Sequence, residues 1–257
     1  MTSAAPKLPP PEPEEKEELA EGTLISHLLE LRSRLMKAVG AIGVVFLCLA
    51  PFTSRVFELV SAPLRKVLPT GEMIVTDVAA PFLTPFKTTF FVALFSAMPV
   101  VLYQIWQFVA PGLYKKEKRL ARPLFASSVV LFYAGMTFAY FVVFPIMFKF
   151  FVGSTPAGVA MMTDISSYLD FVLLLFLAFG IAFETPIGVL LLLWSGLCPA
   201  KTLAGARPFV FLGSFVVGML LAPDVFSMTL MAIPMYLLYE AGLIAGRFLF
   251  PNKAAKH

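Results

Sequence analysis

The sequence predicts an all-α membrane protein with six transmembrane helices. Of its 257 residues, 59% are hydrophobic and 14% are charged, and its mean hydropathy is +0.85. A soluble domain carries about 25% charged residues, so the composition excludes that class. Helices cross a ~30 Å hydrocarbon core with ~20 apolar residues, because their backbone groups are paired internally. Four runs of this kind are present, at residues 35–52, 88–110, 123–148 and 171–194.

The last apolar region is divided by a Pro-Asp pair into two shorter runs, 209–222 and 225–239. At ~1.5 Å per residue these runs reach only about 21 and 23 Å. They form either two short spanning helices, with Asp224 capping the second, or a re-entrant hairpin. We favour two spans, because Arg207 precedes the first run and Arg247 follows the second.

Charge predicts the orientation and the division of the chain. Most of the 20 Lys and Arg residues fall in segments on the side of the N-terminus, so both termini are expected in the cytoplasm. This bias explains the net charge of +4 without a nucleic-acid partner. Residues 1–22 are rich in Pro and Glu and predict a disordered cytoplasmic leader. Residues 23–250 form the membrane domain, and 251–257 form a short cytoplasmic tail.

No motif for catalysis, metal binding or a cofactor is found in the sequence. The only histidines are His27 and His257, and no glycine-rich phosphate loop is present. We therefore expect no catalytic residue, no metal and no cofactor. The loops between spans one and two and between spans three and four carry Pro, Val and Leu, and they are expected to form an ordered cap on the outer face.

Two acids lie on the predicted inner face. Glu30 is followed by Arg34 at the i,i+4 spacing of a helix, beside a stripe of leucines. Glu117 lies among lysines and arginines in the next inner loop. One interpretation is an interfacial amphipathic helix with a solvated ion pair, followed by an ordinary positive-inside loop. The other is a binding site for a cationic partner.

Glu184 lies inside the fourth predicted span, in the stretch AFGIAFETP. An acid in a span costs about 2.5–3.5 kcal/mol on insertion scales, and it usually faces a cavity or a partner. We therefore expect Glu184 to line a concave, partly hydrated groove, where it holds water or a polar group of a partner helix. Gly180 and Pro186 on either side allow the helix to bend or to be approached closely.

Six stretches follow one another in an order that identifies a family. They are HLLELRSRL, IVTDVAAPFLTPFK, LYQIWQFVAPGLYKKEKR, FYAGMTFAYFVVFP, FGIAFETP and FVVGMLLAPDVFSMTLMAIPMYLLYE. Together they resemble the TatC family, the polytopic subunit of the twin-arginine protein translocase, over residues 24–250. The resemblance implies a six-helix protein of the bacterial cytoplasmic membrane that recognises twin-arginine signal peptides on folded cargo. It also implies TatB-like and TatA-like single-span partners, a homo-oligomeric receptor complex, and transport driven by the proton-motive force.

The resemblance assigns roles to particular residues. The implied signal-peptide site comprises Glu30, Arg32, Phe108 and Glu117. Pro63 matches a proline of the outer cap, and Glu184 and Asp224 match polar positions in the membrane. Met228 stands where relatives often carry a polar residue, and it marks the expected contact with a partner helix. Only one proline precedes Asp224, whereas relatives often have two.

The chemistry of arginine supports this assignment independently. A guanidinium donates a planar fork of N–H groups, so two consecutive arginines need two carboxylates, as Glu30 and Glu117 supply. Positive surroundings repel other cationic peptides. A small-solute transporter or channel is the alternative function, but the sequence lacks the two related halves typical of that class. A passive membrane scaffold is the third possibility.

Overall fold

The computed structural model describes residues 13–65, 74–109, 118–156, 159, 162–196, 198–222 and 224–249. Within these residues five helical segments are long and apolar enough to cross a membrane, and a shorter sixth follows Arg207. The five are Ile25–Ala62, Ala80–Val109, Ala121–Gly153, Ile165–Ser195 and Val225–Leu249, and the sixth is Arg207–Leu221. The prediction of an all-α membrane fold is therefore confirmed.

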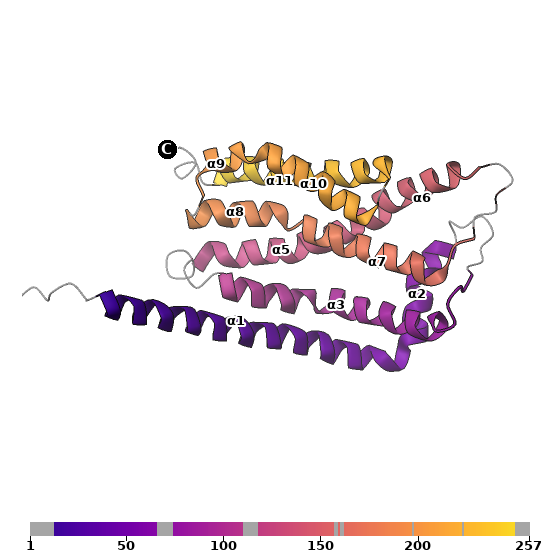
Figure 1. Cartoon of the computed structure of the whole chain (residues 1–257), viewed down its shortest axis with the longest axis horizontal. Coiled ribbons are helices and arrows are strands. Elements are labelled where there is room, and N and C mark those ends of the chain that lie inside the picture. Colours follow the sequence, from indigo (N-terminus) through magenta and orange to yellow (C-terminus); the bar gives the residue numbers. More distant parts are fainter. Residues whose placement is uncertain are drawn as a thin grey trace, which may run out of the picture.

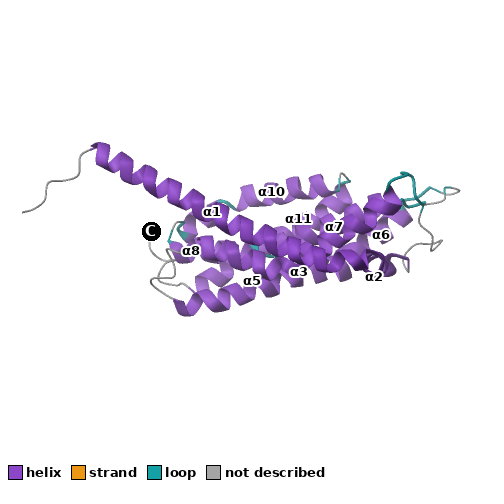
Figure 2. Ribbon diagram, turned by 90° about the horizontal axis from the view of Figure 1, so that it is seen from below, coloured by secondary structure: helices purple, strands orange, loops and turns teal. Residues whose placement is uncertain are grey.

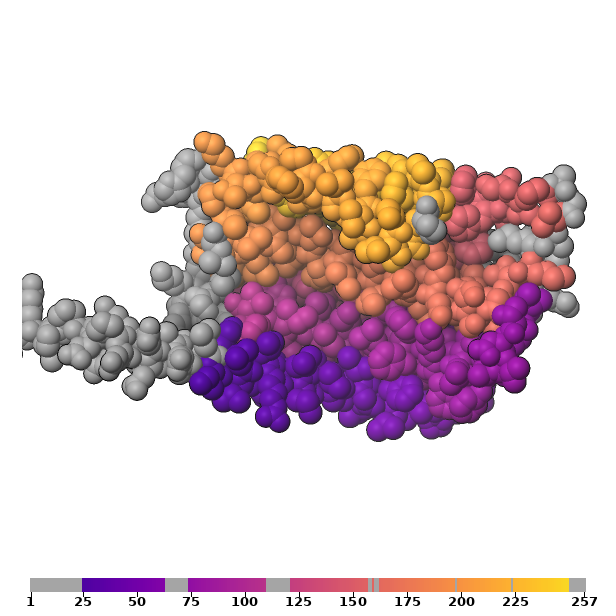
Figure 3. Space-filling model, in the orientation of Figure 1, coloured from indigo at the N-terminus to yellow at the C-terminus, as the bar shows by residue number. Residues whose placement is uncertain are grey.

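The helices lie side by side along the long axis of the molecule (Figure 1). α1 (Pro13–Leu49) begins at the end of the bundle where α11 (Val225–Leu249) finishes, and we call this the termini end. The opposite end, which carries α2 (Thr53–Arg65), is the cap end. In Figure 3, α1 forms one long edge of the visible face, and the last helices form the other. The two described ends of the chain lie at the same end of the bundle, as expected for a chain that crosses the membrane an even number of times.

α1 is longer than the sequence predicted and extends past the other helices at the termini end (Figure 2). It begins at Pro13, inside the segment 1–22 that composition assigned to a disordered leader. Proline is tolerated in the first turn, and the Glu, Leu and Ala that follow are strong helix formers. Residues 1–12 lie outside the described part, and the division into leader, domain and tail remains a prediction. Of the described α1 side chains, only Ala38 is buried, so most of this helix is free to face lipid.

The last two helices differ in length. α10 (Arg207–Leu221) has 15 residues, as expected for a short span, but α11 has 25 and continues beyond residue 239, where the sequence predicted its end. The prediction stopped before Glu240 because that residue is charged. In the structure the Glu240 carboxylate accepts hydrogen bonds from Arg207 and Tyr236, so the charge does not end the helix. Only one of the two helices is therefore short.

The third and fourth spans form the centre of the core. The third consists of α5 (Lys118–Phe138), a five-residue π-helix (Ala139–Val143) and α6 (Phe144–Gly153). The fourth consists of α7 (Ile165–Ala182) and α8 (Thr185–Ser195), and α9 (Ala200–Gly205) follows it. Phe132 and Phe179 are fully buried between these spans. A methyl group at Gly180 would lie 2.6 Å from Phe132 Cε2, so the close approach that this glycine predicted is confirmed.

The ordered cap is also confirmed in its described part. α2 packs on α3 (Ala80–Val109), and Ile74 pairs with the backbone on both sides of Asp164 in an isolated β-bridge. Asp164 caps α7 by accepting hydrogen bonds from the amides of Ser166 and Ser167. Its second oxygen accepts the amide and the hydroxyl of Thr76. One carboxylate therefore joins the two loops of the cap end.

Asp164 makes the stability of the cap dependent on pH. Hydrogen bonds from the Ser167 amide and from the Thr76 and Ser166 hydroxyls hold the pKa of its carboxyl well below the usual range. A lowered pKa contributes stability above the unfolded value of about 3.9, and this contribution is lost as the pH falls through the folded pKa. We expect Asp164→Ala to lower the melting temperature of the purified protein at pH 7, and this difference to shrink below about pH 4. Glu58→Ala, which removes another acid at the cap end, is the control and should melt like the wild type. A difference that does not change with pH would contradict this account.

Candidate functional site

Glu30 lies on α1 at the termini end and is held by an ion pair. Arg34, one turn later, places Nη2 3.1 Å from Glu30 Oε1. The Glu30 side chain is 36% exposed and the Arg34 side chain 23%, so the carboxylate is the more accessible partner. The i,i+4 pair that the spacing predicted is therefore present, and the carboxylate can still be reached from solvent.

α3 forms the other side of this site. Arg34 Nη1 donates to Gln107 Oε1 at 2.5 Å, and Gln107 Nε2 in turn donates to the Tyr103 hydroxyl. Beside them, the rings of His27 and Phe108 stack with centroids 4.4 Å apart. His27 precedes Glu30 by about one turn, so this stacking places Phe108 beside the acid. The resemblance assigned Phe108 and Glu30 to one site, and the structure places Phe108 against the ring of His27, one turn before Glu30 on α1.

Of the other two predicted residues of the site, the structure describes only Arg32. It lies on α1 and is exposed. Glu117 lies outside the described residues, so its distance from Glu30 is not given by the structure. The flanking helices α3 and α5 meet at the termini end, the end that also carries the first half of α1 (Figure 1).

The fourth span is broken at Glu184. α7 ends at Ala182 and α8 begins at Thr185, with Phe183 and Glu184 in a turn. Pro186 has no N–H to donate to the carbonyl of Ala182, so a regular helix cannot continue through this point. The bend that Pro186 predicted is therefore present. It places a carboxylate at the break.

Glu184 is oriented toward the third span. Its Oε2 accepts a hydrogen bond of 2.6 Å from Ser128 Oγ on α5, and Ser128 is completely buried. Its Oε1 is buried and has no hydrogen-bond partner among the described residues. Burying an oxygen without a hydrogen-bond partner raises the free energy of the folded state. A hydrogen bond donated by water or by a partner protein would remove this cost. No sequence pattern singled out Ser128.

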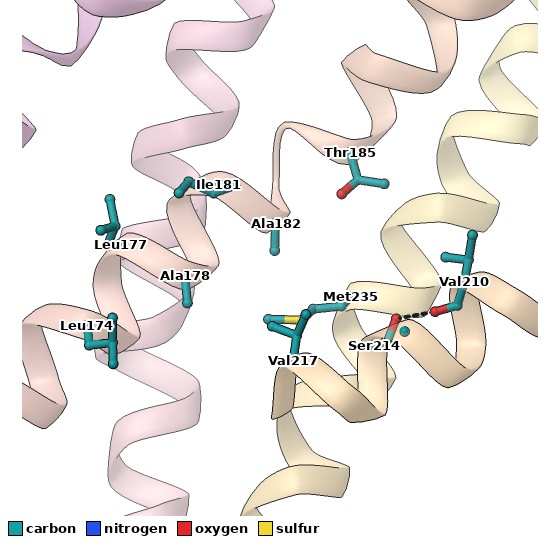
Figure 4. Close-up of a pocket in the computed structure, with 11 residues that line it drawn as sticks. Leu174, Leu177, Ala178, Ile181, Ala182, Thr185, Val210, Ser214, Val217 and Met235 are labelled. Atoms are coloured by element: carbon teal, nitrogen blue, oxygen red, sulfur yellow. Dashed lines mark hydrogen bonds between the residues drawn. The ribbon is translucent and has the colours of Figure 1, made fainter. Parts of the chain in front are cut away.

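A groove opens beside the break, between the fourth span and α10 (Figure 4). We call it the lateral groove; its volume is about 560 Å³. Its lining is Leu174, Leu177, Ala178, Ile181, Ala182, Thr185, Val210, Gly213, Ser214, Val217 and Met235. The Ser214 hydroxyl is bonded to the carbonyl of Val210, so the surface is almost entirely apolar. Thr185 lines the groove while its neighbour Glu184 reaches α5, so the acid lies next to this groove rather than within its lining.

The remaining predicted residues lie at separate places. Asp224 Oδ1 accepts the Ser227 amide at 2.8 Å, which confirms the predicted cap of α11. Met228 packs against Gly218 of α10, where an added methyl group would lie 2.7 Å from the Met228 carbonyl oxygen. Pro63 belongs to α2 at the cap end. The hydrogen bonds of Asp224 and of Glu184 involve different elements, the start of α11 and α5.

A contact that the sequence did not predict joins α10 to α11. Arg207 Nε and Nη2 donate to the two oxygens of Glu240, at 2.6 and 2.9 Å. The Tyr236 hydroxyl donates to the same carboxylate at 3.0 Å. In the sequence, Arg207 served only as evidence for two spans. The signal that could have predicted this contact was a basic residue at the start of one helix and an acid in the next helix.

The fold and these sites define a polytopic helical membrane protein with a cluster of polar side chains at one end and an acid at a helix break. In its described part, no group of three or more His, Cys, Asp and Glu side chains could hold a metal ion. The family described as Sec-independent protein translocase protein (TatC) matches residues 26–234. The chain belongs to the TatC family.

Relatives and solved structures agree with this assignment. The TatC of Azotobacter chroococcum mcd 1 is 60% identical over 225 residues, which cover 87% of this chain and 88% of that protein. The TatC of Escherichia coli K12 is 56% identical over 227 residues, or 88% of each chain. A crystal structure titled as the twin arginine translocase receptor TatC has a TM-score of 0.78 and 39% identity, and the match covers 86% of this chain and 98% of that one.

These findings select among the functions that the sequence left open. The family consists of components of a protein translocase, so the chain is a multi-pass protein-transport subunit and not an enzyme. The six-span fold of the solved TatC structures also decides between two spans and a re-entrant hairpin for the last two helices. The alternative of a small-solute transporter or channel is not supported.

Proposed function

We propose that this chain is the receptor for twin-arginine signal peptides in a translocase of the bacterial cytoplasmic membrane, with its termini end in the cytoplasm. The observation that carries the proposal is the Glu30 carboxylate, partly exposed beside the Phe108 ring at the end of the bundle where both described chain ends lie. A solved relative is titled as a twin arginine translocase receptor. The excess of Lys and Arg on the same side favours the cytoplasmic orientation.

Recognition in this proposal combines three contacts. Glu30 and Glu117 each accept the fork of one signal arginine, and Phe108 contacts the apolar residues that follow the arginine pair. Arg32, exposed on the same helix, adds positive charge that repels other cationic peptides. Folded cargo then crosses with the help of partner proteins, and the proton-motive force drives the step.

Photo-crosslinking tests this function. A twin-arginine signal peptide with a photoreactive residue after the arginines is added to membranes containing the protein, in parallel with its twin-lysine version. We expect the arginine peptide to crosslink at the termini end and the lysine peptide to crosslink much less, because an ammonium cannot supply the planar fork. Equal crosslinking yields from the two peptides would exclude a receptor role and would indicate that the chain is only a scaffold for its partners.

The lateral groove is proposed as a seat for the transmembrane helix of a TatB-like or TatA-like partner. Its lining is apolar and comes from the broken span and the short α10, and Met228 at the start of α11 extends the same edge. Glu184 immediately precedes Thr185 of the groove in the chain, and its buried Oε1, which has no partner among the described residues, would accept a hydrogen bond from a polar group that the partner helix brings there. We propose that several copies of the chain and these partners form the receptor complex.

Substitutions at Glu184 test this role. Glu184→Ala should leave the protein inserted but reduce export and crosslinks to the partner helix, whereas Glu184→Gln should be milder because its amide oxygen still accepts a hydrogen bond. Ser128→Ala is the matched control: it removes the internal bond and keeps the acid, and it should preserve the partner crosslinks. Unchanged export and crosslinks in Glu184→Ala would exclude a functional role for this acid.

A further inference from the structure

Glu30 is already occupied by a guanidinium of the chain itself. Arg34 reaches Oε1 through Nη2 alone, at 3.1 Å, so the contact is a single bond and not the two-bonded fork that guanidinium and carboxylate groups can form. Partly exposed i,i+4 pairs within one helix are weak. A guanidinium arriving from solvent with both N–H groups aligned would bind the same carboxylate more strongly.

The second arm of Arg34 is held by a different helix. Nη1 donates to Gln107 Oε1 on α3 at 2.5 Å, which is shorter than the bond to Glu30. The Gln107 amide group donates in turn to the Tyr103 hydroxyl, which fixes the orientation in which the oxygen faces Arg34. Arg34 can therefore turn away from Glu30 and keep its bond to Gln107. Its guanidinium remains beside the site after release.

From this geometry we propose that Arg34 competes with signal peptides for Glu30 and so sets the affinity that a peptide needs in order to occupy the site, and that Gln107 receives Arg34 when a peptide displaces it. The proposal rests on the proposed function, since it takes Glu30 as an acceptor of a signal arginine. Every cationic peptide has to displace Arg34 or bind beside its positive charge, so Arg34 weakens all of them. The affinity of weakly binding peptides then becomes too low for them to occupy the site, while a well-aligned arginine pair still binds.

The test measures peptide affinity for the full-length protein in nanodiscs, by fluorescence anisotropy at fixed salt. Arg34→Gln should bind a twin-arginine peptide roughly 2- to 5-fold more tightly, the range expected for losing an exposed competing ion pair. The twin-lysine peptide should gain by a similar factor. Lys37→Gln is the control, because it removes one charge from the same helix about 10 Å from Glu30 along the axis, and it should change binding little.

A second substitution examines the role of Gln107. Gln107→Leu removes the acceptor that holds a displaced Arg34, so it should weaken peptide binding in the wild-type background. The same substitution should have no effect in the Arg34→Gln background, where no guanidinium needs to be received. Gln107→Leu keeps Arg34 in place, so its expected loss of binding tests the proposal where Arg34→Gln folds poorly.

The possible outcomes separate the two proposals. If Glu30→Gln leaves twin-arginine binding unchanged, the proposed receptor site itself is wrong. If Glu30→Gln weakens binding but Arg34→Gln does not strengthen it, only the competition is excluded. A gain in Arg34→Gln that Lys37→Gln matches would assign the effect to general charge repulsion, and it would also overturn the inference.

Discussion

Replacing Glu30 or Glu117 by lysine is expected to abolish the binding of a twin-arginine signal peptide. A hydrogen bond to a charged group contributes about 1.5–3 kcal/mol, so removing one arginine contact alone should weaken binding roughly 10- to 150-fold. Lysine also places a like charge against the incoming arginine, so the loss should exceed that range. Crosslinking of the peptide at the termini end, measured in membranes, reports the effect.

Glu58→Lys is the matched control for this result. It makes the same change of charge on α2 at the cap end, where we expect no contact with the arginines, and it should leave crosslinking unchanged. Equal losses in all three variants would mean that the change in overall charge matters and that no specific site is present. Wild-type binding in Glu30→Lys would move the recognition site elsewhere on the cytoplasmic face.

Gly135→Leu is expected to produce the largest loss of stability. A methyl group at this position in α5 would overlap the backbone carbonyl of Phe179 on α7 and would lie 2.9 Å from Phe183 Cγ. Backbone atoms cannot move aside as a side chain can, so the third and fourth spans would have to separate. Overpacking of a core costs about 1–3 kcal/mol and sometimes more. The melting temperature of the purified protein should fall clearly, and the Ser128–Glu184 bond between the same spans should be lost with it.

Gly188→Ala is the control for this prediction. Gly188 lies in α8, and a methyl group built there meets no atom within 4 Å. Because alanine favours helix over glycine by up to about 1 kcal/mol, this variant should be as stable as the wild type or slightly more stable. If Gly135→Leu and Gly188→Ala melted at the same temperature, the close contact between the two spans would not be important for stability.

Much of the fold was predictable because hydrophobic length and local signals decide it. The apolar runs located the spans, Asp224 was correctly predicted as a helix cap, and Pro186 predicted the break in the fourth span. The predicted end of α11 was wrong because the apolar run stops at residue 239, whereas the helix continues through the charged Glu240. Its partner, Arg207, lies at the start of another helix, and a sequence pattern does not show that these two ends meet.

Contacts between helices depend on how each helix is rotated about its axis, and this limits what the sequence can predict about the site. The Glu30–Arg34 pair lies within one helix, so its spacing predicted it. The bond from Arg34 to Gln107 and the bond from Ser128 to Glu184 each join two helices. In a membrane protein, the apolar residues of a helix can face lipid as well as protein. Their pattern therefore indicates only weakly how the helix is rotated about its axis.

A double-mutant cycle between Glu30 and each arginine of the signal peptide, at fixed salt, measures whether this carboxylate binds a signal arginine. Glu30→Gln is combined with peptides in which one arginine is replaced by glutamine, and the four affinities give the coupling energy. Our account predicts a coupling of about 0.5–3 kcal/mol with one of the two arginines. A coupling energy near zero with both would contradict it and would leave Glu30 as the partner of Arg34 alone.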